Sequence, residues 1–423
     1  MPLITSDLEF SDDYPTIEPS LKLDFANARA LDPRITFTRA SVATYVGKDG
    51  LIKTAGENEP RFDHDSITGE SLGLLIEEER TNLFEYSGDF TNADWAKFDV
   101  SISSNSIIAP DGSTNSYTIT EGTANSQHNI TDTTTVTGTK TFSVYAKLAS
   151  GSRLLRIVDY NATDGAVTAR FDLSNGTIDA GSDSSAVIKD CGNGWYRCSI
   201  TTTTTVESNY YISLCQSDST FTYTGDGSSS FYIFGAQLEV GSFPTSYIPT
   251  SGSTVTREKE FPAIETSSID FNDFSQGGEG TLVCEFSNAG AIGSDVAVCF
   301  SGDTHNGATF VGLGTNSNRN AFNRVRVNGT NTVLSTDSNF TTTGFYKVAF
   351  GIGQSRCTLT VRGSSSGVVE DTSVSYDSTP YTKLVLGCDQ TSNSSNNMIN
   401  GTIKSVFYYP TLLTDTQLQT LTQ

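Results

Sequence analysis

The chain has 423 residues, of which 36% are hydrophobic, and its formal net charge at pH 7 is −22. This length predicts two or three domains, and the 24 Phe and 17 Tyr residues supply enough apolar mass for several cores, which excludes global disorder. A nucleic-acid partner needs clustered Lys and Arg to displace counterions from phosphates, so the acidic charge excludes nucleic acid and an anionic membrane surface as partners.

The cysteines predict a protein without a disulfide framework. Seven of them occur with no Cys-x-x-Cys spacing, and an odd count at irregular intervals argues against pairing. Most lie in β-prone runs, where free thiols pack as small apolar groups, so folding in a reducing cytosol is expected. A cross-strand bridge between Cys191 and Cys198 stays open as an alternative.

Residues 1–20 form an acidic arm that contains Pro15 and Pro19. The arm lacks a basic region followed by an apolar core, so it is not expected to be a secretory signal. No run of 18 apolar residues occurs in the chain, and no membrane span is predicted. Because the arm alone buries too little surface to offset the entropy of ordering, we expect a tail or a segment that orders on a partner.

Residues 21–87 are expected to form a meander of short strands. The triplet Lys48-Asp49-Gly50 is typical of a hairpin turn. Alternating apolar residues predict strands at 21–25, 35–39, 43–46 and 72–76. The apolar faces of these strands are small, so the segment is expected to depend on its neighbours for stability. Together with the acidic arm, residues 1–87 are predicted to form one β-rich attachment module.

Residues 88–250 show short strands at regular intervals and no helical period, which indicates a β-sandwich. Strands are predicted at 142–147, 154–158, 167–172, 195–200, 210–214 and 231–234. The last strand continues into residues 234–249, which turn at Gly241 and Pro244 and close the sandwich. Residues 251–259 are predicted to be a linker.

Residues 260–423 repeat this pattern as a second sandwich. Its strands are predicted at 281–286, 296–300, 310–313, 323–327, 346–350, 357–361, 384–387 and 403–408. Thr414-x-x-Gln417 ahead of Leu418 is a capping-box pattern and predicts one short terminal helix. A chain that begins near Arg257 is expected to fold alone.

Three groups of motifs resemble known modules. Resemblance to the N-terminal module of bacteriophage tail-fibre and head-spike-fibre proteins rests on Leu23-Asp-Phe-Ala, Pro60-Arg-Phe-Asp-His-Asp and Gly73-Leu-Leu-Ile-Glu-Glu-Glu-Arg. Similarity to a carbohydrate-binding-module-like jelly roll rests on Phe142-Ser-Val-Tyr-Ala-Lys, Gly192-Asn-Gly-Trp-Tyr-Arg and Gly235-Ala-Gln-Leu-Glu. Similarity to a concanavalin A-like, laminin-G-like sandwich rests on Glu279-Gly-Thr-Leu and Gly401-Thr-Ile-Lys-Ser-Val-Phe-Tyr-Tyr-Pro.

The resemblance implies an all-β virion structural protein, a tail fibre or spike, assembled in the host cytoplasm and displayed on the virion surface. Its lectin-like sandwiches are expected to adhere to host-surface glycans. Residues 1–87 are expected to bind other virion proteins, and the chain is expected to be a homo-oligomer, most simply a trimer. A capsid decoration or baseplate protein that binds no sugar is the alternative.

Catalytic patterns are sparse in this sequence, and we predict that the chain is not an enzyme. His64, His128 and His305 lie in three different modules, whereas a Ser-His-Asp relay needs its members within hydrogen-bond reach. Concanavalin-like glycosidases carry a Glu-x-Asp-x-x-Glu strand. Glu279 and Glu285 are six residues apart and lack the middle Asp. A glycan depolymerase remains the less favoured alternative.

No cofactor and no metal ligand set is predicted. Asp63-His64-Asp65 has ligand types at alternate positions, but a charged turn before Thr68-Gly69 explains it more simply. The resemblance to carbohydrate-binding-module-like jelly rolls implies a structural calcium in many of them, held through a carboxylate on the last strand. Ile233-Phe-Gly-Ala has none, which leaves Glu239 or Asp89 as substitutes for an oxygen-ligand site.

Sugar-binding candidates are aromatic and basic side chains. The indoles of Trp95 and Trp195 can stack on sugars, but core or rim positions are favoured for them. The basic pair Arg324 and Arg326 shares a strand face and stands out against the acidic total. This pair is expected to meet an acidic glycan, a carboxylate of a neighbouring subunit or a local ion partner. The predicted carbohydrate-binding residues are Tyr160, Tyr210, Tyr211, Arg324 and Arg326.

Overall fold

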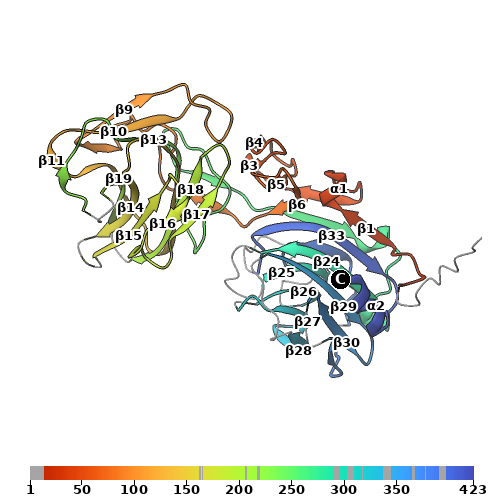
Figure 1. The fold of residues 1–423 in the computed structure, drawn as a ribbon. Coiled ribbons are helices and arrows are strands. Elements are labelled where there is room, and N and C mark those ends of the chain that lie inside the picture. The colour runs from red at the N-terminus through yellow and green to blue at the C-terminus, as the bar shows by residue number, and fades with distance from the viewer. Residues whose placement is uncertain are drawn as a thin grey trace, which may run out of the picture. The chain divides into compact units, whose positions relative to one another are not determined.

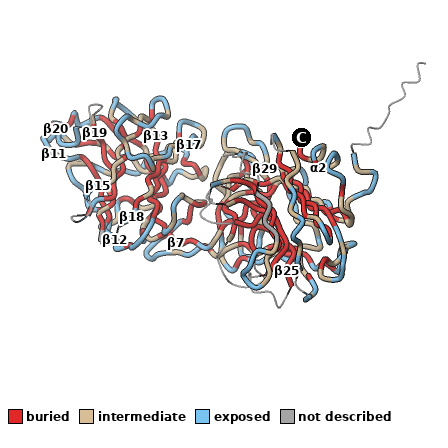
Figure 2. Tube along the Cα trace, turned by 90° about the horizontal axis from the view of Figure 1, so that it is seen from below, coloured by how far each residue is buried: buried red, intermediate tan, exposed pale blue. Residues whose placement is uncertain are grey.

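The structure, a computed structural model, consists of antiparallel β-sheets with very little helix, which confirms the predicted all-β sandwich class. The described residues are 14–161, 163, 165–204, 207–216, 220–288, 295–302, 309–316, 318–336, 344–363, 367–376, 378–389 and 397–423. Most of the predicted acidic arm lies outside them. The chain divides into two compact units, shown in Figure 1, and Figure 2 shows buried residues filling the interior of each. Unit 1 comprises residues 1–38, 72–78 and 260–423, and unit 2 comprises residues 39–71 and 79–259.

Unit 1 is built on two sheets. One runs in the order β31 (Val369–Asp371), β30 (Cys357–Val361), β29 (Phe345–Ile352), β24 (Gly280–Ser287), β33 (Gly401–Tyr409) and β6 (Ser71–Ile76), with β1 (Leu21–Asp24) also beside β33. The other runs β2 (Ile35–Thr38), β23 (Phe261–Glu265), β32 (Lys383–Leu386), β25 (Asp295–Ser301), β26 (Phe310–Thr315), β27 (Ala321–Val327) and β28 (Thr330–Thr336).

Strands from the N-terminal segment complete unit 1. β33 pairs with β24 along one edge, and β1 and β6 share its other edge. β2 pairs in the same way with β23. The short strands β1, β2 and β6 therefore pair with strands of residues 260–423 of the same chain. These pairings cover strand edges that would otherwise be open. The compact units cut across the predicted module 1–87, whose remaining strands lie in unit 2.

Unit 2 is a sandwich of two six-stranded sheets. The first runs β17 (Val187–Asp190), β18 (Tyr196–Thr204), β13 (Gly138–Ser150), β21 (Ser230–Val240), β10 (Tyr117–Glu121) and β9 (Val100–Ser104). The second runs β16 (Thr177–Ile178), β15 (Gly165–Asp172), β14 (Leu154–Asn161), β19 (Glu207–Cys215), β12 (His128–Thr135) and β8 (Ala96–Phe98). Apolar residues from alternate positions of both sheets, such as Phe142, Ile157 and Ile212, meet in one core.

Smaller elements surround this sandwich. Unit 2 also contains β5 (Phe62–His64) and the strand pairs β3 (Ala43–Val46) with β4 (Ile52–Ala55), β7 (Arg80–Asn82) with β22 (Val255–Arg257), and β11 (Asn125–Ser126) with β20 (Tyr223–Thr224). The β3–β4 hairpin confirms the turn signal at Lys48-Asp49-Gly50. Part of the predicted linker is regular structure, since β22 lies within residues 251–259.

The stretch 234–249 closes unit 2 through buried polar contacts. β21 lies in the middle of its sheet between β13 and β10, and the chain then turns back across it. The Glu239 carboxylate accepts hydrogen bonds from the backbone N–H of Thr245 at 2.9 Å and from its hydroxyl at 2.7 Å. Gln237 Oε1 accepts a hydrogen bond from the backbone N–H of Ile248 at 2.7 Å. Glu239 is fully buried, so these bonds hold the closing segment in place.

The helices are short. α2 (Asp415–Leu421) begins with the predicted capping box, in which the Thr414 hydroxyl and the Gln417 side chain each satisfy a backbone N–H of the other residue. Figure 1 shows α2 beside β29. The single-turn helix α1 (Phe25–Ala28) and the 3-10 turns η1 (Thr266–Ser268) and η2 (Phe274–Gln276) were not predicted. Among the described residues, no helix is long and apolar enough to cross a membrane.

Candidate functional site

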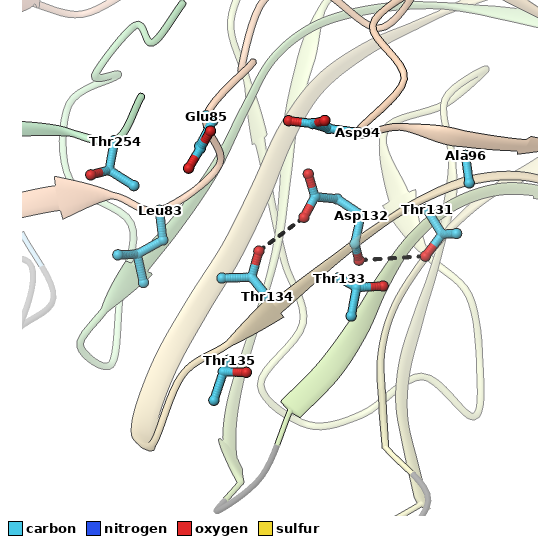
Figure 3. Close-up of a pocket in the computed structure, with 10 residues that line it drawn as sticks. All are labelled: Leu83, Glu85, Asp94, Ala96, Thr131, Asp132, Thr133, Thr134, Thr135 and Thr254. Carbon is cyan, nitrogen blue, oxygen red and sulfur yellow. Dashed lines mark hydrogen bonds between the residues drawn. The ribbon is translucent and has the colours of Figure 1, made fainter. Parts of the chain in front are cut away.

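A pocket lined by carboxylates and hydroxyls opens in unit 2, with a volume of about 550 Å³. Five consecutive residues of β12, 131–135, form one wall. The facing wall comes from the segment between β7 and β8, and Thr254 adds a hydroxyl just before β22. Figure 3 shows the lining residues Leu83, Glu85, Asp94, Ala96, Thr131, Asp132, Thr133, Thr134, Thr135 and Thr254.

Sheet geometry explains why this wall is accessible. β8 pairs only with residues 129–131 of β12, so no strand of the described residues lies beside this edge of β12 beyond Thr131. The segment opposite is anchored by Trp95, which is fully buried and donates its indole N–H to the carbonyl of Tyr86 at 2.9 Å. Packing of Phe84 against Trp95, with 5.0 Å between ring centroids, fixes the same segment. Both walls of the pocket therefore rest on the core of unit 2.

Asp132 is the most perturbed group in the pocket. It lies opposite Tyr210 of β19 and only 7% of it is exposed, because its strand face is the one that also carries the core residue Ile130. Burial raises the pKa of the Asp132 carboxyl to about 6, and the negative charges of Asp94 and Glu85 add to this rise. The hydroxyl of Thr134 donates to Asp132 Oδ1 at 2.9 Å, and this hydrogen bond opposes the rise in pKa.

The second carboxyl oxygen of Asp132 has no hydrogen-bond partner among the described residues. In Figure 3 this carboxyl points toward Asp94 and Glu85 across the pocket. A carboxylate accepts hydrogen bonds, and a threonine hydroxyl both donates and accepts, so the lining offers many partners to a ligand that carries hydroxyl groups. The shared negative charge disfavours an anionic ligand at this site.

Tyr160 and Tyr211, both predicted to bind sugar, lie together on the outer face of the β14–β19 part of the sheet. Tyr160 is 41% exposed and Tyr211 is half-buried. Their positions are diagonal in the register, because Tyr160 is opposite Asn209 and Tyr211 is opposite Val158. Burial raises the pKa of Tyr211, and neighbouring Tyr160 adds to the rise. This aromatic pair is separate from the pocket.

Tyr210 does not fit its predicted role. It points inward, is 0% exposed and packs edge-on against Phe84 and Phe142, with 5.7 Å between ring centroids in each case. A sugar needs an exposed ring face, which Tyr210 lacks. The reason is the alternation of strand faces, which sends Tyr210 and Tyr211 to opposite sides of the sheet.

Arg324 and Arg326 share the outer face of β27, as their spacing predicts. Arg324 is 6% exposed and Arg326 is half-buried. The intervening residue Val325 and the preceding Asn323 face the other sheet, and the Asn323 amide donates to the carbonyl of Thr358 on β30 at 3.2 Å. Since these arginines belong to unit 1, they do not contribute to the pocket of unit 2.

Both tryptophans are core residues, as favoured. Trp95 belongs to the main core of unit 2. Trp195 is 2% exposed, packs with Tyr145, Phe234 and Tyr247, and donates its indole N–H to the carbonyl of Ile108 at 3.0 Å. Neither indole presents a free face to a ligand.

The described histidines stand apart from each other. The ring of His128 is fully buried, with Nδ1 at 3.0 Å from the carbonyl of Asp99 and Nε2 at 3.1 Å from that of Tyr223. His64 Nδ1 lies 3.2 Å from the carbonyl of Val46. His305 lies outside the described residues. Neither described ring lines the pocket.

The carboxylates that were weighed as possible oxygen ligands, Asp63, Asp65 and Asp89, make local hydrogen bonds. Asp63 accepts from the backbone N–H of Val46 at 2.7 Å, and Asp65 accepts from the N–H of Thr68 at 2.7 Å and closes the turn. Asp89 accepts from Thr91. Within the described part of the chain, no three His, Cys, Asp or Glu side chains are close enough together to hold a metal ion. Glu77, which directly follows β6, is buried.

All seven cysteines are free thiols, including Cys191 and Cys198. Burial raises the pKa of both thiols. Six of the seven are buried, which matches the predicted role as small apolar groups.

The pocket residues were missed by sequence reasoning, although one signal was present. Ile130, Asp132 and Thr134 alternate along β12, so a carboxylate occupies a position in phase with a core residue. A charged group on a core-facing position indicates either a buried partner or a functional pocket. Glu85 and Asp94 come from a connecting segment, whose folding across the sheet edge no local pattern predicts.

Comparisons with known proteins show similarity of fold alone. No protein-family model and no curated protein matches this sequence. Among solved structures, the chain is similar to the CBM40 of a Ruminococcus gnavus sialidase bound to α2,3-sialyllactose, at 13% identity and a TM-score of 0.29, over 36% of this chain and 91% of that one. A heptameric pentraxin from Limulus polyphemus matches at 13% identity and a TM-score of 0.30, over 36% and 72%. None of these comparisons bears on a position in a virion.

The prediction that the chain is not an enzyme is contradicted by the same comparison. Trypanosoma rangeli sialidase in complex with sialic acid is among the similar structures, at 11% identity and a TM-score of 0.28, over 73% of this chain and 60% of that one. This similarity assigns no reaction to the present chain. The exclusion of enzymes is therefore withdrawn.

Proposed function

We propose that the chain is a glycan-binding protein and that the pocket of unit 2 takes an uncharged, hydroxyl-rich sugar. The observation that carries this proposal is the carboxyl of Asp132, a residue only 7% exposed, in a pocket lined by the threonine hydroxyls of β12 and the carboxylates of Glu85 and Asp94. A cavity of about 550 Å³ falls within the range of small-ligand sites, about 300–1,000 Å³.

The polar groups that line the pocket need hydrogen-bond partners, which favours a sugar over an apolar ligand. An apolar molecule would desolvate Asp132, Glu85 and Asp94 without replacing their hydrogen bonds with water, which costs free energy. A sugar hydroxyl donates to a carboxylate and accepts from a threonine, so it replaces those bonds. Leu83 and Ala96 supply a small apolar surface for the C–H face of a sugar ring.

We further propose, from the resemblance of the motifs, that the protein is a tail-fibre or spike component that attaches to host glycans. Single shallow sugar sites bind weakly, and linked copies gain about 10²–10⁴ in avidity. A homotrimer on the virion surface, held to other virion proteins through residues 1–87, would supply that repetition. Light scattering of the purified protein tests the oligomer, and a stable monomer at micromolar concentration would count against it.

A second function is favoured by one observation. The pocket places a carboxyl with a pKa of about 6 beside two further acidic groups, and glycoside hydrolysis uses one protonated and one ionised carboxyl. Release of reducing ends from a bound oligosaccharide, abolished by Asp132→Asn, would assign that reaction to the pocket. Binding without release would assign binding alone.

Calorimetric titration with a panel of uncharged oligosaccharides tests the sugar site. Asp132→Asn, which removes a charged acceptor, should weaken the binding of a sugar ligand about tenfold or more, and Thr135→Val about threefold to tenfold. Thr168→Val is the matched control, because Thr168 lies on β15 in the same unit and outside the pocket. Equal affinities in all four proteins would place sugar binding elsewhere.

A further inference from the structure

Two arginines in unit 1 lie side by side on a strand that has no acid next to it. Arg324 and Arg326 occupy alternate positions of β27 and therefore point to the same side of the sheet. Their cross-strand neighbours are Gly312, Leu334, Phe310 and Asn331, none of which carries a negative charge. The two positive charges are thus placed together without a local partner on the strands.

Neither arginine makes a hydrogen bond or a close ion pair within the described residues. Nε of each guanidinium is buried and has no hydrogen-bond partner there. Leaving such a donor unpaired costs free energy, because the group has lost its water without gaining a replacement. Of the predicted alternatives, the local ion pair is therefore not seen. An unpaired, nine-tenths buried Arg324 points instead to a ligand.

An aromatic ring holds Arg324 in place of hydrogen bonds. Its guanidinium carbon lies 4.4 Å from the ring centroid of Phe322, which is on the same face of β27, and 5.9 Å from that of Phe310 on β26. Both rings are buried, so the guanidinium makes cation–π contacts with aromatic side chains that are fixed in the core. Such packing orients the arginine and leaves its N–H donors available to a ligand.

One carboxyl lies near the pair without neutralising it. Asp389, which follows β32, is fully buried, and the Asn397 amide donates to its Oδ2 at 2.5 Å. Its Oδ1 has no partner among the described residues. Burial raises the pKa of Asp389 to about 6, against the opposing influence of Arg326 and Arg324. At neutral pH the cluster keeps a net positive charge, in a chain whose total is −22.

We propose that Arg324 and Arg326 form a second sugar site, which binds the carboxylate of an acidic sugar residue such as a uronic acid. The planar guanidinium matches a carboxylate with two parallel N–H···O bonds, and a second arginine two residues away can bind the same group or the adjacent ring oxygen. Asp389 Oδ1 accepts a hydroxyl of the same sugar. The three groups therefore complement a carboxylate that is flanked by hydroxyls.

Burial and charge favour a sugar over a protein partner. Arg324 is only 6% exposed, so it is reached by a small group and not by a flat protein surface. The acidic total repels long polyanions, which favours glycans that carry isolated carboxylates. This site stands independently of the pocket in unit 2, whose carboxylates favour an uncharged sugar.

Titration of the full chain with a matched pair of ligands tests the proposal. Methyl glucuronoside and methyl glucoside differ in one carboxylate. The Asp132→Asn protein, in which the proposed pocket for uncharged sugars is weakened, should bind the glucuronoside at least tenfold more tightly than the glucoside. Arg326→Gln and Arg324→Lys should each reduce affinity for the glucuronoside about tenfold, and raising NaCl from 50 to 500 mM should weaken it further. Arg362→Gln is the control, since Arg362 pairs with Glu285 in the same unit at 3.3 Å.

Several results would overturn the proposed acidic-sugar site. Equal binding of both ligands, or glucuronoside binding unchanged by the two arginine variants, overturns the proposal. Citrate binding as tightly as the glucuronoside, and lost in the same variants, shows a general carboxylate site and overturns the sugar assignment. A change of mass in light scattering for the arginine variants, without glucuronoside binding to wild type, assigns the pair to a subunit contact. Asp132→Asn should leave glucuronoside affinity unchanged, which separates this test from that of the pocket.

Discussion

Single buried charges carry the functional argument for this protein. Asp132 in unit 2 is 7% exposed and Arg324 in unit 1 is 6% exposed, and Arg324 Nε has no hydrogen-bond partner among the described residues. Burying an unsatisfied charged group costs several kcal/mol, so a fold retains one where a ligand supplies the missing bonds. The two groups have opposite signs and point to ligands of different charge.

Asp132→Asn should change the pH dependence of stability in a defined window. The raised pKa means that the native state binds the Asp132 proton more tightly than the unfolded state does, so stability falls as pH rises from about 4 to about 6 and stays lowered above. The variant lacks this loss and should gain at most about 3 kcal/mol relative to wild type over that window. Thermal melts of both proteins between pH 4 and pH 7 measure it. A stability difference that is constant across this range would contradict the assigned pKa.

Strand alternation decides how many of these residues can be predicted. The pairing of Arg324 with Arg326 follows from spacing alone, and so does the separation of Tyr210 from Tyr211. Which tyrosine faces the core could not be predicted, because that depends on which sheet face meets the second sheet. Asp132 lies in a threonine run that looks solvent-facing until Ile130 fixes the phase.

At the scale of elements, β33 shows how distant segments combine. It pairs with β24 on one side, and its other side is divided between β1 and β6, which lie more than 300 residues earlier. The strands themselves were predictable from apolar alternation at 21–25, 72–76 and 403–408. Their pairing was not, because register between strands so far apart depends on tertiary contacts and not on any local pattern.

Gly73 in β6 tests this pairing. It has φ of +97°, and a Cβ atom there would lie 2.2 Å from the carbonyl oxygen of Ile403 on β33. Gly73→Ala should therefore cost the left-handed strain of about 1–2 kcal/mol plus about 1–3 kcal/mol for the overlap. The control is Gly277→Ala in the same unit, with φ of +87° and open space at the Cβ position, which should cost only the first part. Chemical denaturation gives both values, and equal costs would mean that β6 does not pack against β33 as described.

At the scale of the whole molecule, the two compact units are not successive pieces of chain. Unit 1 takes strands from residues 21–38 and 72–78, and unit 2 takes residues 39–71 in between. The predicted boundaries at 87 and 260 follow from the grouping of predicted strands along the chain. The compact units follow the burial of side chains instead. In unit 1 the N-terminal segments bury Leu21, Leu23, Leu74 and Ile76, each at most 2% exposed.

A truncated chain that begins at residue 258 should consequently fail to melt cooperatively. It loses four buried aliphatic side chains, worth roughly 6–12 kcal/mol at about 1.5–3 kcal/mol each, which is comparable to the whole stability of a domain. It also exposes one edge of β33. Circular dichroism of the truncated and full chains against temperature measures this. A cooperative transition at the temperature of the full protein would restore the earlier expectation that these residues fold alone.

If this chain carries two sugar sites of opposite charge, a glycan array probed with three proteins should separate them. Wild type should bind both uncharged and carboxylated glycans. Asp132→Asn should lose the uncharged set and keep the carboxylated one, and Arg326→Gln should do the reverse. Absence of binding by wild type, or loss of both sets in either variant although that variant still melts cooperatively, would contradict the presence of two separate sites.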